Sequence, residues 1–359
     1  MHSALWHARS LFLKTRPVHL TFFVTRRCNL RCPFCFYQEA RDAPGDAPEL
    51  SAEEVRRVAA SLGRLLWVAF SGGEPFLRDD LAELAGIFHD ANRVAFFTLP
   101  TNGLLTEVVA ERTQEILDRC RNSVVVVKLS LDGVGQAHDA IRRAPGAFEK
   151  AMRTCERLAA LAERHPRLEL GVNTLFCSEN QGRMDEIIEF VHGLGGVRSH
   201  TLTMVRGNLR EARYGRVDLC GYREAIRHLE SRWRSGAHRR PRFGGARLKA
   251  AQDRLQKRLI HRTLSEHRRV APCYAGRLSL VLSEGGDVRA CEERPGESFG
   301  NVRDAGYDMG RLLRTGWAER IRGDIAAGGC HCSHECNLLT NILFNPAMQP
   351  KLLWECARS

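Results

Sequence analysis

Apolar runs and amphipathic stretches alternate from residue 18 to about residue 203 of the chain. The apolar runs are short and rich in Val, Phe and Thr, which favours strands. The run at 123–131 contains consecutive valines, as expected of a strand buried on both faces. The stretches between the runs have the length and the polar–apolar mixture of helices. Strands are therefore predicted at 19–25, 66–70, 94–99, 123–131, 168–175 and 199–205, and helices at 51–62, 80–92, 106–120, 146–164 and 183–194.

The first predicted helix carries its own start signal. Ser51 stands at the N-cap and Glu54 follows three residues later, as in a capping box. Strands separated by helices of this length imply parallel βαβ units. Six such units predict an α/β fold, a partial (β/α)6 barrel of the TIM type. We expect this barrel to cover residues 15–215, after an N-terminal extension at 1–14.

The pattern changes after residue 215. Two basic helical stretches, 219–235 and 245–268, flank a loop that contains Pro and Gly, and we expect residues 216–268 to form a helical connector. Its basic face would bind an anion or a partner, or would pack as an amphipathic connector on the barrel. From Cys273 onward, Gly, Cys and short β-rich pieces predict a small Cys-rich domain at 269–345 with a β-hairpin, followed by a C-terminal tail at 346–359.

Composition narrows the class of protein. The chain has 359 residues, of which 43% are hydrophobic, so it is globular rather than disordered. Lys and Arg number 54 against 42 Asp and Glu, and the net charge of +12 fits either an anionic partner or a solvated basic surface. No apolar run approaches the roughly 20 residues of a membrane helix, and the first residues lack the pattern of a secretory signal. We therefore expect a cytoplasmic protein without a membrane span.

Thirteen cysteines are many for a cytoplasmic chain. Their odd number and the length of the chain argue against a disulfide scaffold, so clustered cysteines indicate a metal or redox site. Cys28, Cys32 and Cys35 come directly after the first predicted strand. A structural zinc site and a ferredoxin-type run each need four protein ligands. Three thiolates on a cubane instead leave one iron open for a substrate or cofactor.

The spacing Cys-x3-Cys-x2-Cys after the first strand of a (β/α) barrel resembles the signature of the radical S-adenosylmethionine (SAM) superfamily. The resemblance implies that these three cysteines hold a [4Fe–4S] cluster whose open iron chelates the amino and carboxylate groups of SAM. One-electron reduction would then cleave the sulfonium and give a 5′-deoxyadenosyl radical, which abstracts hydrogen from a substrate. Phe34 occupies the place of the aromatic residue that lies near the adenine in this family.

Further motifs resemble this family at the ends of the later strands. Gly72, Gly73 and Glu74 match the motif that holds the methionine amino group. Asn102 lies in a Thr-Asn-Gly turn, which in the family is near the cofactor. Ser130 resembles the position that binds the ribose.

An arginine completes the implied cofactor site. Arg142 resembles the residue that pairs with the cofactor carboxylate, with Arg143 as the rival candidate. Asn173 on the fifth strand is a further lining candidate, and a simple turn or strand role is the alternative for Asn102 and Asn173. The position of these residues at strand ends indicates a functional site independently of the family, because barrel proteins form their sites at the carboxyl ends of the parallel strands.

A second group of cysteines lies in the C-terminal region. Cys273 and Cys291 stand near the two ends of the predicted hairpin, so they can share one metal centre. The pattern, completed by Cys330, Cys332 and Cys336, resembles the SPASM/twitch domains of radical SAM enzymes, which bind auxiliary [4Fe–4S] clusters. Full SPASM domains have more cysteines and two clusters, so the resemblance implies one auxiliary [4Fe–4S] cluster, as in the twitch form.

The spacing leaves open which four of these five cysteines bind the second cluster. Cys332 and Cys336 resemble the pair at cluster spacing, which makes Cys330 either the fourth ligand or a spare. His331 and His334 would act as hydrogen-bond donors around the cluster, with zinc ligation by these histidines as the alternative. A zinc ion held by four thiolates is the alternative.

The sequence thus predicts a radical SAM oxidoreductase or maturase, with a peptide side chain or a small hydroxylated metabolite as substrate. The auxiliary cluster would assist oxidation or position the substrate, and a flavodoxin or ferredoxin would donate the electron. The alternative is a zinc-stabilised nucleic-acid-binding protein that uses the basic stretch at 232–269. Against it, few aromatic residues interleave those charges and no groove-reading motif is present. An electron carrier of the ferredoxin type is a third interpretation.

Overall fold

The strands of the structure form one sheet, in the order β6-β5-β4-β3-β2-β1-β7-β8-β9. The computed structural model describes the chain apart from residues 1, 39–41, 43–47, 235–240, 329 and 359. From β1 to β6 the strands pair in parallel and in the order of the sequence. Their bounds are β1 His19–Thr25, β2 Trp67–Gly72, β3 Phe96–Thr101, β4 Val124–Ser130, β5 Leu168–Phe176 and β6 Val197–Met204.

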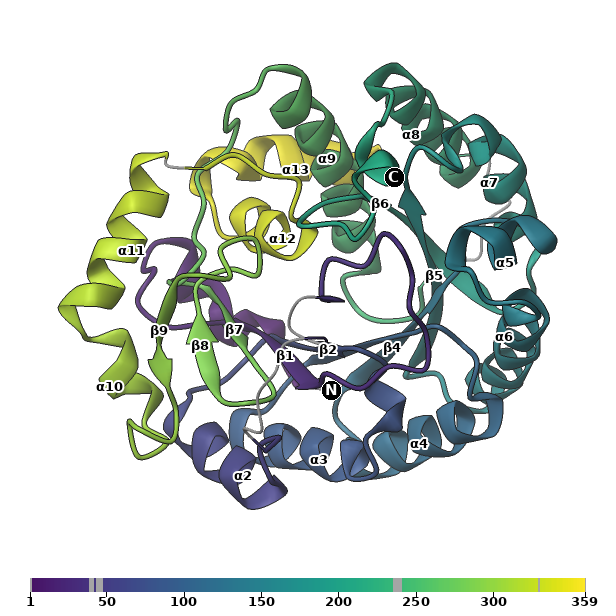
Figure 1. The fold of residues 1–359 in the computed structure, drawn as a ribbon. Helices are drawn as coiled ribbons and strands as arrows, with labels where there is room; N and C mark the ends of the chain where they lie inside the picture. Colours follow the sequence, from purple (N-terminus) through teal and green to yellow (C-terminus); the bar gives the residue numbers. More distant parts are fainter. Residues whose placement is uncertain (1, 39–41, 43–47, 235–240, 329, 359) are drawn as a thin grey trace.

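Helices form the crossovers and cover the outer face of this curved sheet (Figure 1). They are α2 Ala52–Ser61, α3 Leu81–Asn92, α4 Thr106–Arg119, α5 Gln136–Arg142, α6 Ala147–Arg164 and α7 Met184–Gly193, with short 3-10 segments η1 Ala4–Leu11, η2 Pro75–Leu77, η3 Gln181–Arg183 and η4 Ala212–Gly215. The predicted partial (β/α)6 barrel is confirmed. The pattern did not predict α5, because a helix of less than two turns gives little periodicity to detect.

Alternate strand residues separate the two faces of the barrel sheet. Phe22 on β1 packs against Phe70 on β2 and Phe88 on α3, with ring centroids 6.2 Å apart in both pairs. On β4, Val127 and Leu129 belong to the same buried core, whereas Lys128 between them faces the other way. Lys128 Nζ donates to Ser199 Oγ on β6 at 2.7 Å. The face toward the helices is therefore apolar, and the inner face carries polar side chains.

Glu54 has two tasks at the start of α2. Its carboxylate accepts from Ser51 N at 2.8 Å and its own N–H donates to Ser51 Oγ at 3.2 Å, so the predicted capping box is present. Arg303 Nε lies 2.6 Å from Glu54 Oε1, and the Tyr307 hydroxyl donates to the same oxygen at 2.9 Å. The hydrogen bond from Arg303 is the main reason why the pKa of Glu54 falls to about 2. One carboxylate thus caps a barrel helix and binds the C-terminal region to it.

The C-terminal strands extend the barrel sheet. β7 (Ser279–Leu282) pairs in parallel with β1, and His19 lies opposite Ser279. The predicted hairpin follows, since β8 (Asp287–Arg289) pairs antiparallel with β7, and β9 (Ser298–Asn301) adds a further strand. The region predicted at 269–345 therefore shares its sheet with the barrel predicted at 15–215.

Helices replace part of the β-rich structure and the tail expected near the C-terminus. The two connector helices are present as α8 (Leu219–Arg234) and α9 (Ala246–Ser265). The helices α10 Met309–Leu313, α11 Gly316–Ala327, α12 Glu335–Leu343 and α13 Gln349–Ala357 follow. The expected tail at 346–359 is largely α13, which lies beside α9 (Figure 1) because Leu352 packs into one buried cluster with Leu255, Leu259 and Ile342. Cys356 packs against this cluster.

Ion pairs engage basic side chains of α9. Arg254 Nη2 donates to the Glu355 backbone oxygen on α13 at 2.8 Å, and Arg258 Nη2 lies 2.7 Å from Glu230 Oε2 on α8. These contacts join α8, α9 and α13, which agrees with a helical connector that packs on its neighbours. They give no support to the interpretation as a nucleic-acid-binding surface. Part of the basic loop between α8 and α9, at 235–240, lies outside the described residues. None of the helices in the described part of the chain is both long and apolar enough to cross a membrane.

Removing the Glu54 side chain tests this link between the barrel and the C-terminal region. We expect Glu54→Ala to lower the midpoint of thermal unfolding by more than Ser51→Ala does. Ser51→Ala removes only a cap worth about 1 kcal/mol, whereas Glu54→Ala also removes the ion pair with Arg303. Calorimetry of anaerobic protein measures both shifts. Glu53→Ala is the matched control, since Glu53 pairs only on the surface of the same helix, and equal shifts for Glu53→Ala and Glu54→Ala would contradict the prediction.

Candidate functional site

Cys28, Cys32 and Cys35 lie in the loop that leaves the carboxyl end of β1. Cys35 N donates to Cys32 O at 3.2 Å, and Leu30 N donates to the Cys28 sulfur at 3.4 Å. Burial raises the pKa of the Cys32 thiol to about 11, and Cys35 and Cys28 are close enough to raise it as well. A metal binds thiolates, so binding would release the proton that Cys32 otherwise keeps. The mutual influence of these sulfurs fits a group that takes three thiolates from one loop.

Two glycines at the end of β2 hold the backbone that leads into this loop. A Cβ atom on Gly72 would lie 2.2 Å from Thr25 O, and one on Gly73 would lie 2.1 Å from Arg27 O. Gly73 N donates to Thr25 O and Glu74 N donates to Arg27 O, both at 2.9 Å. Any side chain on either glycine would therefore push β2 away from the residues just before Cys28.

Glu74 and Asn102 hold the cysteine loop through a chain of hydrogen bonds. Glu74 is 1% exposed, and its carboxylate accepts from Asn102 N at 2.8 Å and from Phe76 N at 3.4 Å. Burial raises the pKa of Glu74 to about 7, although these hydrogen bonds work against the rise. Asn102 Nδ2 in turn donates to Asn29 Oδ1 at 2.7 Å. This chain of contacts joins the ends of β2 and β3 to the residue after Cys28.

A buried ion pair lies next to the cysteine loop. Arg142 at the end of α5 contacts Asp132 Oδ2 through Nη2 at 2.7 Å and Nε at 2.9 Å. The other carboxylate oxygen of Asp132 accepts from Leu175 N at 2.8 Å, which fixes the pair to β5. Arg142 is close enough to Cys32 to oppose the rise of its pKa. A guanidinium held in this way offers a fixed positive charge beside the three sulfurs.

The remaining predicted residues lie around this pair. The Phe34 ring is 5.8 Å from the Arg142 guanidinium carbon. Ser130 ends β4 opposite Asn173 on β5, whose Oδ1 accepts from Thr203 at 2.6 Å. The rival Arg143 instead points to the surface, where it lies 2.5 Å from Glu211. The structure thus brings Arg142, and not Arg143, to the cysteine loop.

A second site is a cavity of about 150 Å³ in the C-terminal region. A water molecule takes about 30 Å³ of liquid volume, so the cavity has room for a group of several atoms. Four cysteines are among its lining residues, which are Cys273, Ala275, Cys291, Glu293, Arg294, Ile325, Cys330, His331, Cys332 and Asn337. Four thiols around one cavity match the ligand number of a [4Fe–4S] cluster or of zinc.

The sulfurs of this cavity have hydrogen-bond donors. Asn337 Nδ2 donates to the Cys291 sulfur at 3.0 Å, and Glu293 N donates to it at 3.4 Å. Burial raises the pKa of the Cys332 thiol to about 12. Hydrogen bonds to sulfur are one of the means by which proteins tune iron–sulfur clusters, so this donor set fits a cluster.

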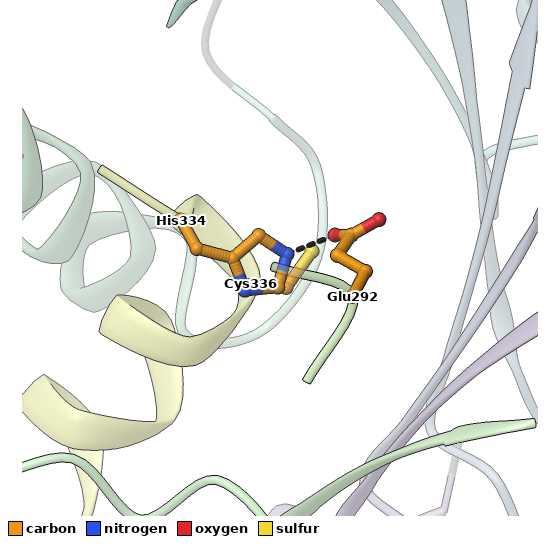
Figure 2. A group of neighbouring side chains, drawn as sticks. All are labelled: Glu292, His334 and Cys336. Carbon is orange, nitrogen blue, oxygen red and sulfur yellow. Dashed lines mark hydrogen bonds and ion pairs between the residues drawn. The ribbon is translucent and has the colours of Figure 1, made fainter. Parts of the chain in front are cut away.

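Cys336 lies apart from the lining of this cavity. Figure 2 shows it with Glu292 and His334, and the potential ligand atoms of these three residues all lie within 4.8 Å of one another. His334 Nε2 is bonded to Glu292 Oε1, and His334 Nδ1 lies 3.9 Å from the Cys291 sulfur. Cys332 lines the cavity and Cys336 does not, although spacing pairs the two.

Arg206, just after β6, joins the two sites. Its guanidinium lies 2.8 Å from Glu293 Oε1, 2.8 Å from Glu335 Oε2 and 3.2 Å from Glu292 Oε1. It also lies 5.3 Å from the ring centroid of Phe36, the residue after Cys35. The segment of the first cysteine group is thereby bound to the segments of the second.

Sequence reasoning missed two of these residues. Asp132 lies two residues after the end of β4, and an acidic residue near a strand end was the available signal. The available signal for Arg206 was the acidic residues next to Cys291 and Cys336. The pairing of Arg206 with Glu335 cannot be read from spacing, because the two residues are 129 positions apart.

Residues 22–191 match the family model of the radical SAM superfamily. Among curated proteins, pre-heme d1 synthase of Dinoroseobacter shibae is 32% identical over 52% of this chain and 44% of its own length. The subtilosin biosynthesis protein AlbA of Bacillus subtilis is 26% identical over 81% of this chain and 59% of its own length. The matches thus cover only part of these relatives.

Solved structures show the same fold. The structure of anSMEcpe with bound AdoMet superposes with a TM-score of 0.64 at 16% identity and covers 96% of both chains. Streptococcus suis SuiB bound to precursor peptide SuiA gives a TM-score of 0.60 at 14% identity, over 89% of this chain and 69% of SuiB. At these identities the likeness concerns the fold alone.

The matched region contains the cysteine loop, Gly72 and Gly73, and the Arg142–Asp132 pair. Enzymes of the matched superfamily use a [4Fe–4S] cluster together with SAM, and three interacting thiols beside a fixed guanidinium fit that pair of cofactors. Fold, site and family model agree, and residues 22–191 form a domain of the radical SAM superfamily.

Proposed function

We propose that this protein abstracts a hydrogen atom from its substrate as a radical SAM enzyme, with Cys28, Cys32 and Cys35 as ligands of the first [4Fe–4S] cluster. The observation that supports this most is the clamped cysteine loop with the Arg142 guanidinium beside it. When bound, the cluster and SAM supply a 5′-deoxyadenosyl radical, which side chains cannot supply. The chain itself binds and orients cofactor and substrate.

The cofactor contacts follow from the placement of each side chain. Arg142, fixed by two bonds to Asp132, would pair with the carboxylate of SAM. Phe34 would lie against the adenine, and Ser130 at the end of β4 would bind the ribose. Because the Arg142–Asp132 pair is formed before the cofactor arrives, little reorganisation is needed on binding.

The second group of contacts would hold the amino group of SAM. Gly72, Gly73 and Glu74 lie at the end of β2, and Glu74 is held in one orientation by the backbone of Asn102 and Phe76. Asn102 would act by positioning Asn29 and hence the cysteine loop. Changes at Asn102 would then affect the cluster and the cofactor together.

The cavity in the C-terminal region would hold one auxiliary [4Fe–4S] cluster, with Cys273, Cys291, Cys330 and Cys332 as ligands. Four thiolates give every iron of a cubane a protein ligand, so the substrate would not bind this cluster directly. When bound, it would supply a one-electron redox centre held by these four residues. Zinc needs the same four thiolates, but a single ion does not need a cavity of about 150 Å³.

A peptide side chain is the substrate class that we favour. AlbA, whose match covers 81% of this chain, is named for the biosynthesis of the bacteriocin subtilosin. SuiB, which shares the fold, has been solved with a precursor peptide. These matches extend over 81% and 89% of the chain.

A tetrapyrrole is the second candidate substrate. Relatives named pre-heme d1 synthase and AdoMet-dependent heme synthase are 32% and 31% identical to this chain, but over only 52% and 53% of it. Their higher identity favours this class, and their shorter coverage disfavours it. The one-electron donor, a flavodoxin or ferredoxin, stays a prediction.

Replacing Cys32 tests the first cluster. We expect Cys32→Ala to abolish the formation of 5′-deoxyadenosine under dithionite and to lower the iron content by about half, from roughly eight atoms per chain, because the auxiliary cluster stays. Chromatography and iron analysis of anaerobically reconstituted protein measure both. Cys220→Ala, which changes an exposed cysteine on α8, is the control and should match the unmodified protein. Normal cofactor cleavage by Cys32→Ala would refute the assignment.

The two neighbouring arginines give a matched pair for the cofactor carboxylate. We expect Arg142→Lys to weaken SAM binding at least tenfold, about 1.4 kcal/mol, because the compact ammonium of lysine cannot span Asp132 and a second carboxylate as the wide planar guanidinium does. Arg143→Lys should leave binding unchanged, since Arg143 pairs with Glu211 at the surface. Equilibrium dialysis of reconstituted protein with labelled SAM measures the affinities. Equal affinities in the two variants would show that Arg142 does not contact the cofactor.

Isotope transfer distinguishes the substrate classes. We expect 5′-deoxyadenosine to gain deuterium when the reconstituted enzyme is given a peptide fraction from cells grown in deuterated medium, since the abstracted atom moves to the cofactor carbon. A tetrapyrrole fraction from the same cells serves as the comparison. Mass spectrometry reads the product, and transfer from the tetrapyrrole fraction alone would overturn the peptide proposal.

A further inference from the structure

The group formed by Glu292, His334 and Cys336 has a mixed set of metal-binding atoms. A carboxylate oxygen, an imidazole nitrogen and a thiol sulfur all lie within 4.8 Å of one another. They come from the turn after β8 and from the start of α12, and they point toward one another (Figure 2). We propose that these three residues bind a single divalent metal ion of the zinc or ferrous class, separate from the auxiliary cluster.

The position of His334 fits a metal ligand. Its side chain is 1% exposed, Nδ1 lies 3.9 Å from the Cys291 sulfur, and Nε2 faces Glu292 Oε1. Metal-binding histidines usually have the second ring nitrogen fixed by a neighbour, which orients the ring. Here Cys291 provides that neighbour, and Nε2 is directed at the other two ligands.

The surrounding charge favours a cation at this place. Three carboxylates, those of Glu292, Glu293 and Glu335, contact the one guanidinium of Arg206. Their side chains are 7%, 18% and 16% exposed, so water screens them little. Glu292 also pairs with His334, so a divalent ion that replaces the proton of His334 would keep positive charge beside these carboxylates.

The donor set selects the class of ion. Sulfur and imidazole ligands suit zinc and ferrous iron, whereas magnesium and calcium prefer oxygen alone. Three protein ligands leave a fourth position open, as in catalytic zinc sites. Arg206 contacts Glu292 and also Phe36 next to Cys35, so the metal would lie where the two cysteine regions meet.

Zinc uptake by the complete enzyme tests the proposal. Anaerobically reconstituted protein is equilibrated with one equivalent of Zn²⁺, filtered, and analysed for zinc and iron. X-ray absorption at the zinc edge then identifies the ligands without interference from iron. We expect one zinc per chain in addition to the iron of both clusters, with one sulfur ligand and otherwise nitrogen and oxygen.

Variants connect the zinc to these residues. We expect Cys336→Ala and Glu292→Gln each to weaken zinc binding at least tenfold while the iron content stays unchanged. Cys220→Ala, at an exposed cysteine, should keep the zinc and serves as the control. Because these measurements use no SAM, they stand or fall separately from the proposed radical chemistry.

Four results would overturn the proposal. The first is no stoichiometric zinc, and the second is zinc with four sulfur ligands, which would place it in the cysteine cavity. The third is loss of about four iron atoms in Cys336→Ala, which would make Cys336 a cluster ligand. The fourth is equal zinc binding by the unmodified protein and both variants, which would show adventitious binding.

Discussion

The site depends on how closely the end of β2 approaches the exit of β1. A Cβ atom on Gly72 or Gly73 would meet a backbone oxygen of Thr25 or Arg27 at little more than 2 Å, at 2.2 and 2.1 Å. This contact determines where the chain leaves β1 and hence where Cys28 begins the cysteine loop. The glycines therefore act on the ligands of the first cluster through the backbone, even before any contact with a cofactor is considered.

The two cysteine regions are parts of one mechanical unit. β7 continues the barrel sheet from β1, so the hairpin that carries Cys291 is bonded to the strand that leads into Cys28. Arg206 and the Glu54–Arg303 pair add two further links between barrel and C-terminal region. Electron or hydrogen transfer between two sites requires a fixed separation, and a continuous sheet provides it better than a flexible linker.

Sequence patterns were sufficient for features that are local. The strands, the capping box at Ser51 and the cysteine loop depend on residues close together in the chain, so periodicity and spacing reveal them. The Arg206–Glu335 contact, the division of the five C-terminal cysteines and the packing of α13 depend on residues far apart. Spacing suggested Cys332 with Cys336 as cluster ligands, and in the structure Cys332 lines the cavity while Cys336 lies beside His334 and Glu292.

The division of the cysteines has a chemical consequence. A cluster with four thiolates has no open iron, so it can exchange electrons but cannot hold a substrate group. Any direct coordination of substrate near the auxiliary site would then need a different centre. Among the described residues of that region, Glu292, His334 and Cys336 form a group that offers a metal three protein ligands. Glu292 is the residue after Cys291 and contacts Arg206. Electron transfer and substrate binding would thus be assigned to separate neighbouring groups instead of competing for one cluster.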